Sequence, residues 1–202
     1  IDQEATISGS HIPALTNTTG ATMTVIAGGA LKLGGVAMGA LELASGATLD
    51  ASKVLTWLNS HKSANGLGYE ASAKNEIRIS ASSLSTTTGL LNINGTEVHN
   101  ATAITSVNEL VTSINSKTGA TNVEARIDFD GAIILSNTPG NEANKIAFGN
   151  TPGVLTGITG DYQSSIILES GRGTAAVKVS TGVTNTYGAG GYYIQKADGT
   201  KI

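Results

Sequence analysis

The chain has 202 residues, enough for one large domain or two small ones, and 12 basic and 15 acidic residues give it a net charge of −3. Gly, Ser, Thr and Asn make up 86 residues, whereas Ile, Leu, Val and Phe make up only 47, so any hydrophobic core is thin. This composition excludes helix bundles and coiled coils, the charge offers no basic stripe for nucleic acid, and the lack of cysteine excludes disulfides and thiolate chemistry.

The sequence has no apolar run near the roughly 20 residues that a membrane-spanning helix needs, so we expect no membrane partner. It begins Ile-Asp-Gln-Glu, without an initiator Met and without the basic start of a signal peptide. We therefore expect the sequence to be part of a longer chain.

The first 85 residues read as short strands followed by one helix. Residues 1–29 are a predicted N-terminal strand segment, with strands near Ala5–Ile7 and Met23–Ile26. A first module is predicted at residues 30–85. It contains a turn at Gly34-Gly35, a helix capped by Asp50 with Val54, Leu55 and Leu58 on its apolar stripe, and a hairpin turn at Asn75-Glu76 before Ile77–Ile79.

A second module, at residues 86–150, follows the same plan. The strand Leu91–Ile93 is followed by Asn94-Gly95, the dipeptide that best tolerates positive φ in a tight turn. Ser106 and Glu109 form a capping box for a helix with Val107, Leu110, Val111 and Ile114 on one face and a stop at Gly119. Beyond it, Val123, Ala125, Ile127 and Phe129 alternate with polar residues, which predicts a strand with one buried face before a turn at Asp130-Gly131.

The last segment, residues 151–202, is a predicted β-hairpin region without a helix. Its runs Ser165–Leu168 and Ala176–Val179 resemble Ala132–Leu135 and Asn144–Phe148, and Tyr192–Ile202 reads as a hairpin with an Asp-Gly turn. The fold class expected from the whole sequence is α+β and strand-rich, with two modules in tandem that each combine a small sheet with one helix.

The two modules form an internal repeat, since matched residues recur at nearly constant offsets. Leu33 matches Ile93 at an offset of 60, Leu58 matches Ile114 at 56, and Ile77 and Ile79 match Ile133 and Leu135 at 56. The offset changes only where loops would absorb insertions.

The second module resembles the flagellin hook IN motif, which is named for an Ile-Asn pair. The sequence carries two such pairs, Ile93-Asn94 and Ile114-Asn115, followed by Val-Glu-Ala and an Asp-Gly hairpin. The first module is a more distant copy, with Leu33-Gly34 and Leu58-Asn59 in place of the pairs. The motif occurs in the variable outer domains of bacterial flagellins and in hook-associated and filament-cap proteins.

The resemblance implies a structural protein of the bacterial flagellum, an extracellular, surface-exposed (D2/D3-like) portion of a flagellin that decorates the filament used for motility. Its implied partner is itself, in a homopolymer held together by regions outside this sequence, and contacts with host or glycan surfaces are left open. The alternatives are a filament-cap or hook-associated protein, and a surface adhesin or carbohydrate-binding β-module.

No residue is nominated as catalytic, cofactor-binding or metal-binding, because no nucleophile, base and orienting group can be named together. We therefore predict a chain that is not an enzyme and has no cofactor. His11, His61 and His99 are interpreted as surface residues. Asp128-x-Asp130-Gly131 resembles the start of a calcium loop, but Pro139 stands where the bidentate Glu should be, which favours a hairpin turn.

The remaining candidates are interpreted as loop or packing residues. The Gly-rich stretches 171–173 and 188–191 are followed by no helical pattern, which disfavours a phosphate site. Trp57 is expected to pack at a domain seam. The other features considered are the N-glycosylation patterns at Asn17, Asn94 and Asn100, the O-linked candidates Thr86–Thr88, and a sugar-binding face at Tyr187, Tyr192 and Tyr193.

Overall fold

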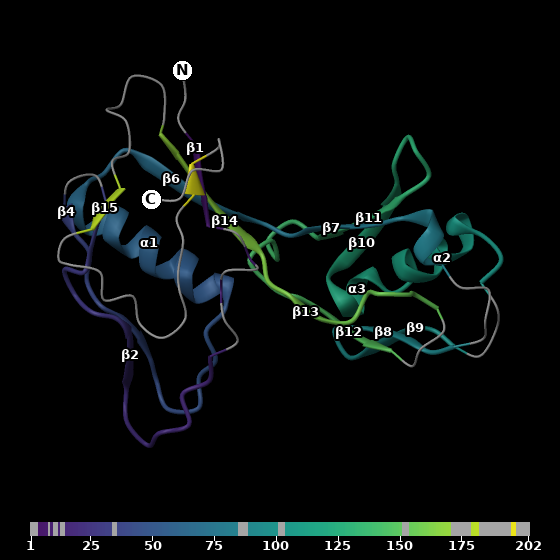
Figure 1. The fold of residues 1–202 in the computed structure, drawn as a ribbon, viewed down its shortest axis with the longest axis horizontal. Helices are drawn as coiled ribbons and strands as arrows, with labels where there is room; N and C mark the ends of the chain where they lie inside the picture. The colour runs from purple at the N-terminus through teal and green to yellow at the C-terminus, as the bar shows by residue number, and fades with distance from the viewer. Residues whose placement is uncertain are drawn as a thin grey trace. The chain divides into compact units, whose positions relative to one another are not determined.

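The computed structural model describes residues 4–7, 9, 12, 15–33, 36–84, 89–100, 104–150, 154–170, 179–181 and 195–196. Short strands in small antiparallel sheets dominate it, together with three α-helices among these residues (Figure 1). The α+β, strand-rich class expected from the sequence is confirmed. Contacts divide the chain into unit 1, residues 1–73 and 165–202, and unit 2, residues 74–164.

The described residues of unit 1 include one α-helix, α1 (Ala51–Asn65). The Asp50 carboxylate accepts a hydrogen bond of 2.8 Å from the Lys53 N–H at its start, and Gly66 ends it with φ 61°, so the predicted cap is confirmed. The strands of the unit are β1 (Glu4–Ile7), β2 (Met23–Ile26), β3 (Leu31–Leu33), β4 (Val36–Ala37), β5 (Leu41–Leu43), β6 (Tyr69–Lys74), β14 (Ser165–Ser170), β15 (Val179–Thr181) and β16 (Gln195–Lys196).

The core of unit 1 forms between the helix stripe and these strands. Val54 and Leu58 of α1 pack with Leu33, Leu43 and the other buried residues of one cluster. Tyr69 is the largest of the fully buried side chains, and its hydroxyl donates a hydrogen bond of 2.6 Å to the carbonyl of Leu58. Burial raises the pKa of Tyr69 to about 12.

Unit 2 places α2 (Val107–Asn115) and α3 (Thr118–Thr121) between two sheets (Figure 1). One sheet has the order β10-β11-β7 and the other the order β13-β12-β8-β9. The described residues of unit 2 also include the 3₁₀ turn η2 (Ala81–Ser83). The strands are β7 (Glu76–Ile79), β8 (Leu91–Ile93), β9 (Thr96–His99), β10 (Val123–Ile127), β11 (Ile133–Asn137), β12 (Ile146–Asn150) and β13 (Gly160–Tyr162).

The start of α2 differs from the predicted capping box by one residue. Ser106 Oγ accepts from the Glu109 N–H at 3.2 Å as expected, but the Glu109 carboxylate accepts from the N–H of Thr105 at 2.8 Å and from its hydroxyl at 2.9 Å. These bonds hold the pKa of Glu109 below its ordinary value. The predicted stop at Gly119 is wrong, since α2 ends at Asn115 and Gly119 lies inside α3. Helix α3 ends at Thr121, and Asn122 caps it with φ 57°.

The two units share one pattern of strand pairing. Hairpin β3–β4 pairs Leu33 with Val36, and hairpin β8–β9 pairs Ile93 with Thr96, 60 residues later at both positions. Strand β15 lies beside β3 with Val179 opposite Leu33, as β12 lies beside β8 with Phe148 opposite Ile93. Strand β14 pairs Ile166 with Ile7 of β1, as β11 pairs Ile133 with Ile79 of β7.

Unit 2 is therefore a repeat of the pairing in unit 1, inserted in the chain between β6 and β14. The predicted hairpin turn at Asn75-Glu76 is wrong for this reason: β6 belongs to a sheet with β14, whereas β7 pairs with β11. Strands β6 and β7 are adjacent in sequence but lie in different sheets. Their pairing is determined by strands that are distant along the chain, β14 and β11, and not by the short segment between them. The boundaries predicted at residues 29, 85 and 150 stay a prediction about the sequence repeat.

We expect residues 74–164 to fold without the rest of the chain. Every buried residue of the second core cluster, from Ile77 to Leu155, lies inside this range, as do the half-buried residues packed on it. An isolated fragment should show a cooperative urea transition and dispersed amide resonances in an ¹H–¹⁵N spectrum. A fragment with the collapsed spectrum of an unfolded chain would contradict the division into units.

Tyr69→Phe tests the core of unit 1 through pH. Because the folded pKa is raised, the tyrosine hydroxyl contributes stability that is present below pH 10 and is lost as pH rises toward 12. The variant should be less stable than the parent by about 1 kcal/mol at pH 8, through loss of one hydrogen bond, and the gap should narrow by pH 11. Urea unfolding followed by the fluorescence of Trp57, the single tryptophan, measures both values. A gap that stays constant with pH would contradict the buried position of the hydroxyl.

Candidate functional site

The Ile-Asn pairs of the predicted motif fix elements of unit 2 to one another. Both isoleucines, Ile93 and Ile114, are completely buried. Asn115 places its side-chain amide beside strand β10, where Oδ1 accepts from the Ala125 N–H at 2.8 Å and Nδ2 donates to the Ala125 carbonyl at 2.9 Å. The amide thus pairs with the backbone as a neighbouring strand would, and it joins the end of α2 to the sheet.

The Asn94 side chain joins the β8–β9 turn to neighbouring elements. With φ 51° at Asn94 and 77° at Gly95, the turn is the tight one that the sequence predicts. The Asn94 side chain accepts from the Ala147 N–H at 2.8 Å and donates to the Thr121 carbonyl at 2.8 Å, so it connects β12 and α3. In unit 1 the matching position of the second pair is Asn59, and there the Tyr69 hydroxyl contacts the helix at Leu58 instead.

Two of the three histidines, His61 and His99, are not the surface residues that we expect from the sequence. His61 and His99 are 7% and 8% exposed, and His11 lies outside the described residues. His61 Nε2 donates to the Leu33 carbonyl at 3.3 Å while Nδ1 accepts from the Asn65 amide at 3.3 Å, so its ring joins α1 to β3. The sequence interpretation failed because a polar residue on the buried side of a helix looks like a loop residue when its neighbours are polar.

The Asp128–Gly131 segment forms the turn between β10 and β11, as predicted. Gly131 has φ 83°, and the Asp128 N–H donates to the Ala132 carbonyl at 2.8 Å. Arg78 of β7 bridges the two carboxylates of Asp128 and Asp130. Among the residues that the structure describes, no group of three or more His, Asp or Glu side chains is placed to hold a metal ion.

The Arg78 bridge alters the ionisation of the turn. The pKa of Asp128 is held below its usual range mainly by the bond from Arg78, and that of Asp130 mainly by the backbone N–H of Ala132 and then by Arg78. All three side chains are in contact with solvent, so the bridge fixes the shape of the turn more than it adds stability.

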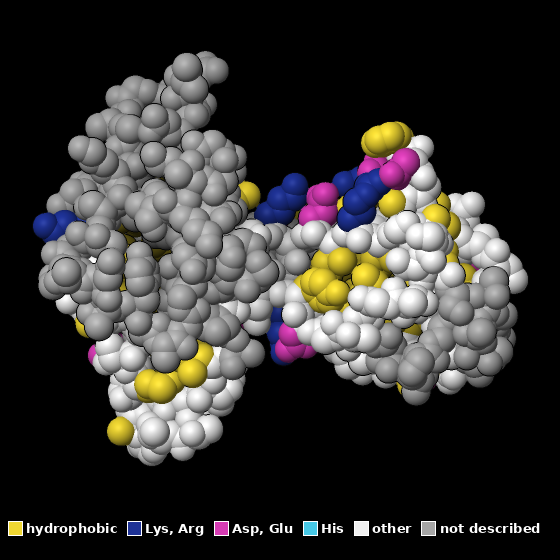
Figure 2. Space-filling model, in the orientation of Figure 1, with side chains coloured by type: hydrophobic (Ala, Val, Ile, Leu, Met, Phe, Trp, Pro, Cys, Tyr) yellow, Lys and Arg dark blue, Asp and Glu magenta, His cyan; other side chains and the backbone are white. Residues whose placement is uncertain are grey.

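Phe129, at the end of this turn, corrects the predicted strand. The alternating pattern places Ile127 and Phe129 on a buried face, but they are 40% and 96% exposed. Strand β10 ends at Ile127, so the alternation continues in sequence after the sheet has ended. In Figure 2 the end of the β10–β11 loop carries hydrophobic atoms above a cluster of acidic and basic side chains. The neighbouring turn residues, Asp128 and Asp130-Gly131, are the signal that could have identified Phe129 as a loop residue.

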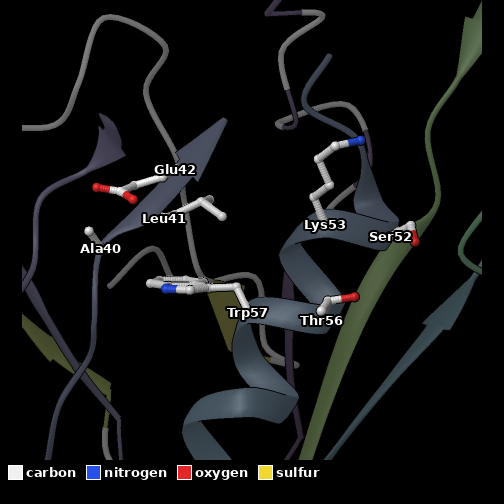
Figure 3. Close-up of a pocket in the computed structure, with 7 residues that line it drawn as sticks. All are labelled: Ala40, Leu41, Glu42, Ser52, Lys53, Thr56 and Trp57. Carbon is white, nitrogen blue, oxygen red and sulfur yellow. The ribbon is translucent and has the colours of Figure 1, made fainter. Parts of the chain in front are cut away.

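Trp57 of α1 is half-buried and its Nε1–H donates to the Gly39 carbonyl at 2.9 Å. Two surface hollows, of about 370 and 330 Å³, share its indole ring as a wall. Figure 3 shows the ring extending from α1 toward Ala40 and Leu41, with Glu42 and Lys53 on either side of the larger hollow. The expected seam position of Trp57 stays a prediction.

The three Asn acceptor patterns differ in the structure. Asn17 is fully buried and donates to the carbonyls of Ala21 and Leu43 at 2.7 and 2.8 Å, which leaves no room for a sugar. Asn94 is bonded on both sides of its amide, and Asn100 is exposed and donates to Glu97 at 3.2 Å. Thr86–Thr88, the Gly-rich stretches 171–173 and 188–191, and Tyr187, Tyr192 and Tyr193 lie outside the described residues.

The described part of the chain contains no helix that is both long enough and apolar enough to cross a membrane. Its assembled features are small sheets, capped helices and amide bonds between elements. They are the features of a structural module, in which the described side chains Asn17, Asn94 and His61 bond to the backbone of other segments.

Residues 91–139 match the flagellin hook IN motif. The match runs from β8 through the β10–β11 hairpin, so it contains both Ile-Asn pairs and the Phe129 turn. It covers about a quarter of the chain and supports a flagellin-type structural role for this part. No curated protein matches the chain at a significant level.

Asn115→Ala should destabilise unit 2 by about 2 kcal/mol, because it leaves the Ala125 N–H and C=O without their partner at the edge of β10. Asn108→Ala, on the exposed side of the same helix, is the matched control and should change stability by less than about 0.5 kcal/mol. Urea unfolding of the chain measures both.

Asn115→Asp adds a pH test of the same contact. A carboxylate can accept from the Ala125 N–H but repels the Ala125 carbonyl, so its folded pKa should lie above the unfolded value of about 3.9. Relative to the parent, the variant should therefore keep more stability at pH 3 than at pH 7. Equal losses at both pH values would show that the amide donor does not matter.

Proposed function

We propose that this chain is an outer, surface-exposed portion of a flagellin, which decorates the extracellular filament used for motility. The observation that carries the proposal is the match of residues 91–139 to the flagellin hook IN motif, in a unit whose Ile-Asn pairs have a clear structural purpose. Its partners are other copies of the same protein in the filament. The assembly contacts of the polymer core lie in regions other than this chain.

The path of the chain supports this role. Strands β1 and β16 are antiparallel neighbours, with Thr6 opposite Gln195 and Ala5 opposite Lys196. Glu4 at the start of β1 and Lys196 at the end of β16 therefore lie at the same end of the strand pair. A unit of this kind suits an outer domain that is carried by two neighbouring segments of a larger protein. Unit 2 is carried in the same way, because its residues 74–164 are inserted between the two segments of unit 1.

The composition suits the same role. Each unit has its own small core and the chain has no cysteine, so it can pass unfolded through a narrow export channel and refold outside without disulfide chemistry.

Immunogold labelling tests the proposal and separates it from the flagellar alternatives. An antibody against residues 1–202 should label native filaments along their whole length if the protein is a flagellin. Gold only at the filament tip would identify a cap protein, and gold only at the hook–filament junction a hook-associated protein. Either restricted pattern, or labelling of the cell body away from filaments, would contradict the proposed role.

A further inference from the structure

Phe129 is an almost fully exposed aromatic residue on a hydrogen-bonded turn. The residue is 96% exposed and lies between Asp128 and Asp130 in the β10–β11 turn. Its own N–H donates to Asp128 Oδ1 at 2.9 Å, and the Ala132 N–H donates to Asp130 Oδ1 at 3.2 Å, so the turn that carries the ring is closed from both sides. An aromatic ring exposed on a preorganised turn is the kind of group that anchors a protein contact at low entropic cost.

The residues around the ring carry both signs of charge. Asp130 lies beside Phe129 in the turn, and Arg78 reaches the turn from β7. Both remain about half exposed, so each can still meet a charge on a partner. The preferred partner surface is therefore apolar at its centre, with one basic and one acidic group at its rim.

The larger hollow at Trp57 has this composition. Ala40, Leu41 and the indole of Trp57 form its apolar part, Thr56 lies at its side, and Lys53 and Glu42 stand at its rim (Figure 3). Its volume of about 370 Å³ is larger than a phenyl ring needs. An aromatic ring stacked on or set edge-on to the indole would gain about 1 kcal/mol beyond the area it buries.

We propose that Phe129 of one copy of the chain docks in the Trp57 hollow of a second copy. The surfaces that meet are different, so the contact is head-to-tail and can extend from copy to copy without closing. The proposal deepens the proposed function and rests on it in one respect. A contact centred on a single ring is well below the area of a stable interface, and it becomes effective only where copies are held close together, as on a filament.

The chain offers a direct probe of the contact, because Trp57 is its single tryptophan and gives one indole N–H resonance in an ¹H–¹⁵N spectrum. For the isolated 202-residue chain we expect this resonance to shift progressively as the concentration is raised to about 1 mM, the affinity range of a small contact. Phe129→Ala should weaken the apparent affinity by about tenfold or more. Asn108→Ala, the exposed control on α2, should leave the shift unchanged.

A mixing experiment tests the head-to-tail arrangement. Thr56→Arg places a long side chain in the hollow without touching the buried core, so this variant lacks the hollow but keeps Phe129. Unlabelled Thr56→Arg protein added to ¹⁵N-labelled Phe129→Ala protein should restore the indole shift. An unlabelled variant that carries both substitutions should not restore it.

The proposal is overturned if the indole resonance does not move with concentration, if its shift survives Phe129→Ala, or if the doubly substituted protein restores the shift. Because the measurement uses the isolated chain, it is independent of the location of the protein on the cell. Filament labelling without a resonance shift would overturn the proposed contact and leave the proposed function standing. A resonance shift without filament labelling would overturn the proposed function and leave the contact standing.

Discussion

The packing of a helix on a small sheet is the contact on which each unit depends. In unit 2, Leu110 and Ile114 project from α2 into the cluster that also contains Val123, Ile133 and Leu135 of the sheet. A nine-residue helix is not stable by itself in water, and three short strands without a covered face are not stable either. Each element therefore requires the other, and the apolar stripe on the helix decides where the sheet forms.

This dependence explains why some features could be predicted from the sequence. Helix caps and turns are local: Asp50 and Ser106 bond to the N–H of the third residue ahead, and Asn94-Gly95 takes positive φ at both positions. The period of the helix stripe is local as well, since Leu110 and Ile114 lie on one face by spacing alone. The repeat added long-range information where matched residues fold alike, as in hairpins β3–β4 and β8–β9. It was misleading at Ile77–Ile79, which pairs with β11, the strand to which it was matched.

The features that the sequence did not predict depend on partners that are distant along the chain. The pairing of β7 with β11 is one, because Ile77–Ile79 has the same alternation whether its partner precedes or follows it. The exposure of Phe129 is another, since a period of two continues past the end of a sheet without any change in the pattern. The burial of His61 is a third, because its ring donates a hydrogen bond to the carbonyl of Leu33 in β3, which lies 28 residues earlier in the chain.

The abundance of asparagine has a physical purpose in a chain with few large apolar residues. Asn17, Asn75, Asn94 and Asn115 each direct a side-chain amide to backbone groups of other segments, over separations of up to 87 residues. Each such bond adds only about 1 kcal/mol, yet it is directional and fixes register, which a thin apolar core specifies poorly. The bonds to Asn115 also satisfy backbone groups at the free edge of β10, which would otherwise need a further strand. A protein built in this way can keep a defined fold while its exposed turns, such as the one that carries Phe129, vary without cost to the core.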